Sequence, residues 1–324
     1  MLSRIAHELF WLGRNVSRAE LTARMIDGVF QADLQGRPDD PAGVTLSWDA
    51  VLAIMGSTAS PPKRRKDAER PSRAETVALL STDATNANSV VASLERAREG
   101  AHTVRDVISA EMWEAINAVH LGLADASIGV TGYGGPYSFV SYVKSRTALF
   151  WGVASRTMLR DDAYAFLDAG GRFESADMVL RMLRVALPAP GERPASSPRD
   201  GQALALLGAV GGLQAFRRAG AAAPTATAVA NFLLYTRTYP DSVAASIDAV
   251  RSSLELADAN PRASEPVLRL SRVLADLDFR GRVGRNDDGG LLEVCEIVGR
   301  ELALADGDIT ERYFGGVMSP THVS

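Results

Sequence analysis

Apolar residues recur at spacings of three and four along most of the chain, which is the pattern of amphipathic helices. The pattern is clearest over residues 4–30, 89–126, 175–187 and 242–259. No run of β-branched and aromatic residues alternates over enough positions to predict a strand. The chain is therefore predicted to be all-α.

Clusters of proline and glycine separate these segments. Residues 34–43 end the first helix, and residues 188–201 form the strongest candidate linker. The glycine-rich residues 129–139 have neither the Lys-Ser/Thr pair nor the preceding strand of a phosphate-binding loop. We therefore expect residues 129–139 to connect two helices.

The sequence also contains a weak internal repeat. A shift of 157 residues superposes residues 13–26 on residues 170–183, and a shift of 153 superposes residues 89–94 on residues 242–247. Two matches in the same order at nearly the same offset indicate a duplication. In the first alignment, the identical or similar pairs are Gly13 and Gly170, Ala19 and Ala176, Glu20 and Asp177, Arg24 and Arg181, Met25 and Met182, and Ile26 and Leu183.

This repeat predicts one domain made of two related halves, residues 1–160 and 161–324, joined by a linker at about 186–200. We expect the halves to form a duplicated helical bundle packed about a pseudo-two-fold axis. The seam between such halves is a natural place for a binding site.

The first predicted helix carries charge on the side opposite its core stripe. At 100° per residue, the core arc contains Ile5, Leu9, Leu12, Val16, Ala19, Ala23 and Ile26. The opposite side carries Arg14, Arg18 and Arg24 together with Phe10, Trp11, Leu21 and Met25. Since an exposed face rarely holds so many large apolar residues, we expect both sides of the helix to be covered, with its arginines in a cleft or an interface.

Buried guanidinium groups need partners. Glu20 precedes Arg24 by four residues, which favours an ion pair along the helix. One glutamate cannot pair with three arginines, so we expect other helices or a bound anion to supply the remaining partners.

Residues 95–117 offer a second charged stripe. On a continuous helix, Arg98, His102, Arg105 and Ser109 share one face, flanked by Glu99 and Asp106. Two such helices either interlock through buried ion pairs or leave a positively charged pocket suited to a carboxylate or a phosphate. The pattern alone does not decide between these two arrangements.

The composition narrows the function classes. The 324 residues are 46% hydrophobic and 23% charged, with a net charge of −4, which gives no general attraction to nucleic acid. No apolar run approaches the roughly 20 residues that would cross a membrane, so we expect a cytoplasmic protein. The basic run at residues 61–73 is interpreted as a solvated loop.

Cysteine and histidine usage suggests no cofactor. The single cysteine, Cys295, excludes an intramolecular disulfide, and no Cys/His cluster has the spacing of a zinc site. Cys295 lies in an apolar stretch with helical spacing, which predicts a buried structural thiol. We predict neither a metal nor a cofactor.

Five blocks of the chain resemble, in order, those of the bacterial alpha-E family, an all-helical family named for a Glu-Arg motif. The two long blocks are residues 1–24 and 86–117, and the shorter blocks are residues 163–183, 232–247 and 309–314. The first block places the family pattern on Leu12, Gly13, Arg14, Arg18, Ala19, Glu20 and Arg24. The second block places it on Asn86, Ala97, Arg98, Glu99, Arg105, Asp106, Trp113 and Asn117.

The second half of the chain departs from this pattern. Glu174, Asp177 and Arg181 are kept, whereas Gly171 and Ser175 stand where the family has arginine. A third family arginine is replaced by Asp241. Either the second half is a degenerate copy of the site, or the site has become asymmetric and is kept in the first half.

The resemblance implies partners and a role. Alpha-E proteins are typically encoded beside circularly permuted ATP-grasp ligase-like proteins and transglutaminase-like proteins, which suggests a system that forms or modifies amide bonds. Acyl phosphates and carboxylates are intermediates of such ligation, and guanidinium groups bind them in bidentate fashion. On this hypothesis a small anionic substrate contacts Arg14, Arg18, Arg24, Asn86, Arg98, Arg105, Asp106, Asn117, Glu174, Asp177 and Arg181.

Glu20 and Glu99 are the catalytic candidates, either orienting the arginines or accepting a proton from an attacking amine. A carboxylate paired with arginine is a weak base, which favours the orienting role. The alternative hypothesis is a non-catalytic scaffold or interaction protein whose buried Arg/Glu pairs are purely structural. Under either hypothesis the chain is a candidate homo-oligomer. An independent enzyme is the least favoured interpretation, since the sequence offers no nucleophile with a nearby base.

Overall fold

Helices account for nearly all the regular structure of the chain. The computed structural model describes residues 1–35, 48–56, 72–123, 136–187, 198–220, 223–283 and 288–315. These residues form thirteen α-helices, one short 3-10 helix (Pro261–Ala263) and no strand, which confirms the all-α prediction. The helices are α1 (Ser3–Gln35), α2 (Trp48–Met55), α3 (Arg73–Ser81), α4 (Val90–Thr103), α5 (Ala110–Leu123), α6 (Tyr137–Thr157), α7 (Asp162–Ala186), α8 (Pro198–Ala209), α9 (Leu213–Arg218), α10 (Ala226–Tyr235), α11 (Val243–Ala257), α12 (Glu265–Val283) and α13 (Asp288–Phe314).

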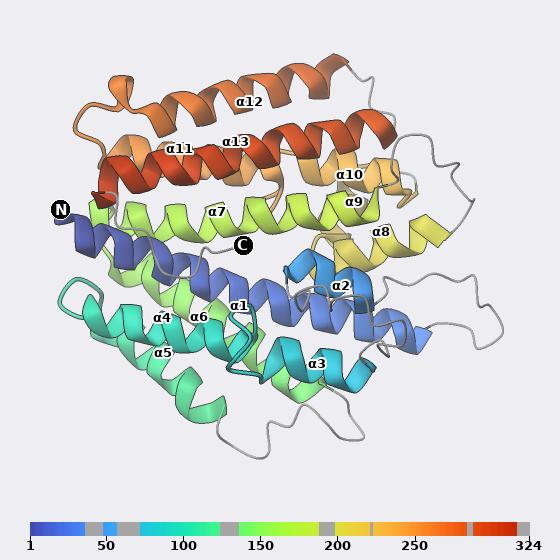
Figure 1. Cartoon of the computed structure of the whole chain (residues 1–324), viewed down its shortest axis with the longest axis horizontal. Coiled ribbons are helices and arrows are strands. Elements are labelled where there is room, and N and C mark those ends of the chain that lie inside the picture. The colour runs from blue at the N-terminus through green and yellow to red at the C-terminus, as the bar shows by residue number, and fades with distance from the viewer. Residues whose placement is uncertain are drawn as a thin grey trace, which may run out of the picture.

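Helices α1 and α7 lie side by side at the centre and run in the same direction (Figure 1). Gly13 of α1 lies against the carbonyl oxygen of Leu167, and Gly170 of α7 lies against the carbonyl oxygen of Phe10. A methyl group added to either glycine would overlap the facing oxygen. The two glycines therefore set the close approach of the central helices.

Each central helix has its own set of neighbours. Helix α1 packs on α4 and α6, and α5 packs on both of these; α7 packs on α11 and α13, and α12 packs on both of these. The first set lies below the central pair in Figure 1 and the second set above it. The short helices cross between the sets, since α8 contacts α1 and α2 contacts α7.

Helix α1 is covered on both sides, as predicted. Phe10, Leu21 and Met25 on its charged side are at most 6% exposed, and Leu9 and Ile26 on its core stripe are fully buried. These side chains belong to one continuous hydrophobic core that also includes α7 and both outer sets of helices. The arginines of α1 consequently lie among packed helices.

The continuous helix predicted over residues 89–126 is wrong. Helix α4 ends at Thr103, and α5 begins at Ala110 after a turn. The Ser109 hydroxyl accepts a hydrogen bond from the Met112 backbone N–H (3.2 Å), so this side chain starts a new helix instead of continuing the old one. Arg98 and Arg105 therefore do not share one helical face.

Helices α4 and α11 begin in the same way. The Ser89 hydroxyl accepts from the Ala92 N–H and the Ser242 hydroxyl accepts from the Ala245 N–H, both at 3.1 Å. The turns before them match as well, because each serine N–H donates to the carbonyl three residues earlier. The two capping serines are 153 residues apart, which is the second offset of the internal repeat.

Some sequence features lie outside the described residues. These are most of the basic run, most of the linker expected at about 186–200, and residues 129–135 of the glycine-rich stretch. Cys295 is fully buried in α13, which confirms the predicted structural thiol. Burial raises the pKa of the Cys295 thiol to about 12.

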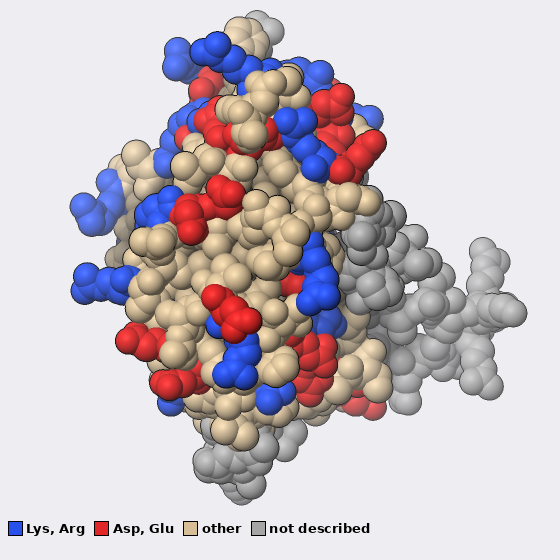
Figure 2. All heavy atoms as spheres, turned by 90° about the vertical axis from the view of Figure 1, so that its left-hand side faces the viewer, with Lys and Arg blue, Asp and Glu red and all other residues tan. Residues whose placement is uncertain are grey.

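Charged side chains of both signs are interspersed over the face shown in Figure 2. Among the helices that the structure describes, none combines the length and the apolar character needed to traverse a bilayer.

Candidate functional site

A buried carboxylate from α7 joins the arginines of α1. Glu174 is 0% exposed, and it accepts hydrogen bonds from both ends of the Arg18 guanidinium, each at 2.7 Å. The Arg14 Nε donates to the same carboxylate at 3.1 Å. Glu174 thus ties two turns of α1 to α7.

Arg14 is held from several sides. Its Nη1 donates to Asp306 of α13 at 2.9 Å, and its guanidinium lies 4.6 Å from the Trp11 ring centroid and 4.8 Å from that of Phe173. The residue is only 3% exposed. The hydrogen bonds and the ring contacts leave Arg14 enclosed by protein.

Arg181 completes this group. Its Nη2 lies 2.8 Å from an Asp177 oxygen and 3.6 Å from a Glu174 oxygen, and its Nη1 donates to the Ile54 carbonyl of α2 at 3.2 Å. We call the six residues the charge cluster: Arg14, Arg18, Glu174, Asp177, Arg181 and Asp306. Its three arginines face three carboxylates, so its formal charges balance.

Opposite charges in the cluster favour the ionised forms of Glu174 and Arg14. Burial alone would raise the pKa of Glu174, but the Arg18 and Arg14 guanidinium groups outweigh burial and hold that pKa well below its usual range. Burial likewise opposes ionisation of Arg14, yet Asp306 and Glu174 raise its pKa above the ordinary value. The charge cluster is thus an internal ion network whose arginines already have partners.

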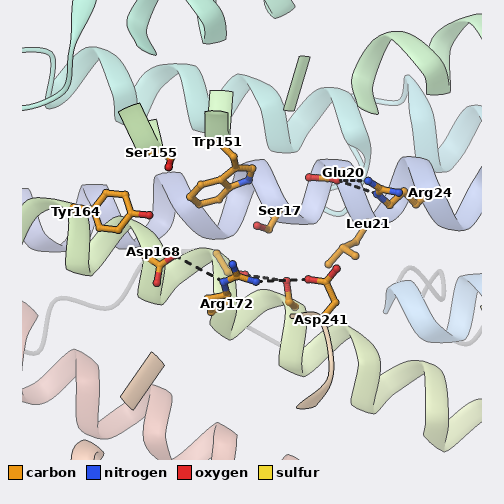
Figure 3. Close-up of a pocket in the computed structure, with 12 residues that line it drawn as sticks. Ser17, Glu20, Leu21, Arg24, Trp151, Ser155, Tyr164, Asp168, Arg172 and Asp241 are labelled. Atoms are coloured by element: carbon orange, nitrogen blue, oxygen red, sulfur yellow. Dashed lines mark hydrogen bonds and ion pairs between the residues drawn. The ribbon is translucent and has the colours of Figure 1, made fainter. Parts of the chain in front are cut away.

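A pocket opens beside the charge cluster, where α1, α6 and α7 meet (Figure 3). Its volume is about 270 Å³. We call it the seam pocket, and its lining residues are Ser17, Glu20, Leu21, Arg24, Trp151, Ser155, Tyr164, Asp168, Gly171, Arg172, Ser175 and Asp241. The predicted seam between α1 and α7 therefore contains a cavity.

Two arginines lie on opposite sides of the seam pocket. Arg24 Nε donates to Glu20 at 2.9 Å, which confirms the ion pair expected from their spacing. Arg172 lies 3.8 Å from Asp168 and 3.8 Å from Asp241, which is too long for a hydrogen bond to either carboxylate. Its Nη1 donates to the Pro240 carbonyl at 3.3 Å. Arg172 therefore keeps more capacity to bind a ligand than any arginine of the charge cluster.

Aromatic and small residues shape the rest of the seam pocket. The Trp151 ring packs on Gly171, with ring carbons 2.7 Å from the position that a Cβ would take. Tyr164 forms part of one side, and Figure 3 shows both rings beside the cavity. Removal from water raises the pKa of Tyr164 and, against the pull of Arg172, also that of Asp241.

The other predicted site residues lie elsewhere, which corrects the expectation that Arg98 and Arg105 meet Arg14 in one hollow. Arg98 Nε donates to Asn117 at 2.9 Å between α4 and α5. Arg105 is exposed in the turn after α4, where the helix ends too early to carry it toward α1.

The remaining three predicted residues are also placed away from the seam pocket. Glu99 and Asp106 are exposed. The Asn86 side chain donates to the Leu79 carbonyl at 2.9 Å, in the turn between α3 and α4. The Asn86 contact gives that residue a local structural role.

Sequence reasoning missed several residues of both groups. Asp168 and Arg172 are four apart on α7, and this spacing is a detectable signal for an ion pair. Asp306, Trp151 and Tyr164 gave no such signal, because their roles depend on how α13, α6 and α7 pack against α1.

Over the described residues, no group of three or more His, Cys, Asp or Glu side chains could hold a metal ion.

Comparison with known proteins identifies the family. No curated protein and no solved structure matches the chain. The Alpha-E model, described as a predicted α-helical domain with a conserved ER motif, matches residues 1–314. The chain therefore belongs to the Alpha-E family.

Proposed function

We propose that this protein is the helical component of an ATP-grasp-associated system that forms amide bonds, and that its seam pocket binds a small substrate bearing a carboxylate or a phosphate. The strongest support is the position of Arg172, 3.8 Å from two carboxylates and hydrogen-bonded to neither. A guanidinium group placed in this way can form bidentate hydrogen bonds to an incoming anion.

The proposal moves the binding role from Arg14 and Arg18 to Arg24, one of the predicted residues, and to Arg172, which the sequence analysis did not single out. Arg14 and Arg18 each already donate two hydrogen bonds to buried or partly buried carboxylates, so anion binding is assigned to Arg24 and Arg172. Glu20 orients Arg24 through their hydrogen bond. Glu99 is exposed on α4 and has no role in this pocket.

The partner remains a circularly permuted ATP-grasp protein, which would supply the activated acyl group, and a transglutaminase-like protein is a possible further partner. This part of the proposal rests on the gene neighbourhood that the resemblance to alpha-E proteins implies. Co-expression of the two chains tests it directly. A stable complex on size-exclusion chromatography is expected, and elution as two separate proteins at micromolar concentration would contradict the partnership.

Ligand binding is tested by calorimetric titration with amino acids, dicarboxylates, inorganic phosphate and ATP. We expect at least one of these anions to bind the wild type, and Arg172→Gln to weaken its binding by about tenfold or more, the loss of a charged hydrogen bond. Arg280→Gln is a matched control. Arg280 is 34% exposed and pairs with an aspartate four residues earlier, and Arg172 is 36% exposed with the same spacing. Equal losses in both variants would contradict the pocket assignment.

A scaffold is the second candidate function, and the charge cluster favours it. Internally neutral and centred on the buried Glu174, the charge cluster holds α1, α7 and α13 together. A chain that binds the ATP-grasp protein while binding no member of the ligand panel would support the scaffold over the substrate-binding component.

We also infer that the two halves, residues 1–160 and 161–324, arose by duplication and pack about a pseudo-two-fold axis. The order of neighbours supports this, because α1, α4, α5 and α6 contact one another as α7, α11, α12 and α13 do. The capping serines of α4 and α11 support it further. In this scheme the axis passes between α1 and α7.

A further inference from the structure

The contacts between α1 and α7 are reciprocal under the 157-residue shift. Gly13 faces the carbonyl of Leu167, and Gly170 faces the carbonyl of Phe10. Shifting Gly13 by 157 gives Gly170, and shifting Phe10 by 157 gives Leu167. Each contact is thus the image of the other, as in an isologous two-fold interface.

Two charged positions are kept in both helices. Arg24 pairs with Glu20, and the corresponding Arg181 pairs with Asp177, each across four residues and each at 2.8 Å. Their other neighbours correspond as well. Arg181 reaches Ile54 at the end of α2, and Arg24 lies near Gly211 after α8, 157 residues further on.

Several positions are charged in only one helix of the pair, among them Arg172, whose counterpart is Asn15. At three others the uncharged counterpart is a small residue: Arg14 corresponds to Gly171, Arg18 to Ser175, and Glu174 to Ser17. In these three pairs the charged member belongs to the charge cluster and the small member lines the seam pocket. The seam pocket is therefore the counterpart of the charge cluster, with three long charged side chains replaced by two serines and a glycine.

This correspondence indicates where an anion would bind. In the charge cluster, the Glu174 carboxylate lies 3.6 Å from Arg181. The counterpart of Glu174 is Ser17 and the counterpart of Arg181 is Arg24, and both line the seam pocket. Where the other half has a carboxylate, the seam pocket therefore has only a hydroxyl. A ligand carboxylate beside Ser17 would meet Arg24 as Glu174 meets Arg181.

The side of the seam pocket around Arg172 also offers acids to a cation. The lining of the whole pocket carries three acids, Glu20, Asp168 and Asp241, against two arginines, Arg24 and Arg172. The acids near Arg172 are weakly paired, at 3.8 Å, although one Asp168 oxygen also accepts from Ser253 at 3.0 Å. A ligand carboxylate bound by Arg172 would leave Asp168 and Asp241 free to accept hydrogen bonds from an ammonium group of the same ligand. A doubly charged phosphate would instead add negative charge to a lining that is already acidic.

We propose that the seam pocket binds a small zwitterion, an amino acid or a short peptide, with its carboxylate toward Ser17 and the two arginines, Arg24 and Arg172, and its ammonium toward Asp168 and Asp241. Trp151 and Tyr164 contact the remaining part of the ligand. This inference rests on the proposed function and narrows its substrate class.

The binding test uses ligands that lack one charged group. L-alanine and L-alanyl-L-alanine are titrated into the full chain beside N-acetyl-alanine, alanine amide and inorganic phosphate. We expect the two zwitterions to bind at least about tenfold more tightly than the blocked forms, because each blocked form loses one charged hydrogen bond. The ratio of alanine to dialanine affinity distinguishes the free amino acid from the peptide.

The location is tested by the double variant Ser17→Glu/Ser175→Arg. It installs the counterpart of the Glu174–Arg18 ion pair inside the seam pocket, so zwitterion binding should be lost. Arg24→Gln is the second variant, for the case that the double variant does not fold. It should weaken alanine binding about tenfold or more and remove the preference for alanine over alanine amide.

The outcomes separate the two proposals. Unchanged zwitterion binding in Arg24→Gln overturns the inferred location. Binding of N-acetyl-alanine or phosphate as tight as that of alanine overturns the zwitterion but leaves the proposed anion-binding function intact. A wild type that binds no member of the panel overturns the proposed function itself.

Discussion

At the scale of single residues, each arginine of the charge cluster has a carboxylate partner within hydrogen-bond distance, whereas Arg172 of the seam pocket has none. Glu174 is enclosed with Arg14 and Arg18, and breaking a buried ion pair of this kind leaves uncompensated charge. The seam pocket contains residues of the same types at longer distances. Distance and burial, more than residue type, therefore separate the structural arginines from the binding arginines.

Replacing Glu174 should destabilise the fold strongly. Glu174→Gln keeps the shape of the side chain but removes the charge that Arg14 and Arg18 share, so the free energy of unfolding should fall by about 3 kcal/mol or more. Chemical denaturation measures this change. Glu311→Gln, the same substitution at an exposed site of α13, should change stability by less than about 0.5 kcal/mol. Similar small losses in both variants would mean that the charge cluster does not stabilise the fold.

The same carboxylate should make stability depend on pH. Its folded-state pKa lies below the ordinary value of 4.5, so its contribution is complete above that value and declines as the pH falls through it. The stability difference between wild type and Glu174→Gln should be constant from pH 7 to about pH 5. It should then shrink by about 1.4 kcal/mol per pH unit at lower pH. A difference that stays constant down to pH 3 would exclude this carboxylate as the source.

At the scale of helices, the close contact of α1 with α7 depends on two glycines. Gly13→Ala and Gly170→Ala should each lower the free energy of unfolding by at least about 1–3 kcal/mol, because the added methyl group meets a backbone carbonyl that cannot rotate away. Thermal or chemical denaturation measures both variants.

Gly152→Ala is the control for this prediction. Gly152 lies exposed in α6 with open space around the position of a Cβ, so alanine should stabilise the helix there by about 0.5–1 kcal/mol. Stabilisation at Gly13 or Gly170 as well would contradict the close approach of the central helices.

Periodicity predicted the helices well but missed one boundary. The buried positions Ala101, Val104, Ile108 and Met112 continue the spacing of three and four across the turn between α4 and α5. The pattern therefore looks unbroken, and the break is set by the Ser109 cap. That single error placed Arg105 on the wrong face and assigned it to a cleft that it does not reach.

At the scale of the whole molecule, the repeat predicted that α1 and α7 face each other, and these helices do pack side by side. The duplication itself stays a prediction. The repeat did not indicate which residues would be open to a ligand, although Glu20 and Arg24 line a pocket there. Asp306 and Trp151 come from α13 and α6, whose packing on the central pair decides which side is closed and which is open. Such contacts between distant segments carry no local sequence signal.

The central claim is that the seam pocket between α1 and α7 is the binding site. An NMR titration with L-alanine tests it most directly, by following the indole N–H signals of the four tryptophans. The variant Trp151→Phe assigns the signal of Trp151 in the seam pocket. The variant Trp11→Phe assigns the signal of Trp11, which packs on Arg14 of the charge cluster. The Trp151 signal should shift and saturate while the Trp11 signal stays in place, because Trp11 packs on the enclosed Arg14. A saturating shift of Trp11 with Trp151 unchanged would contradict the account.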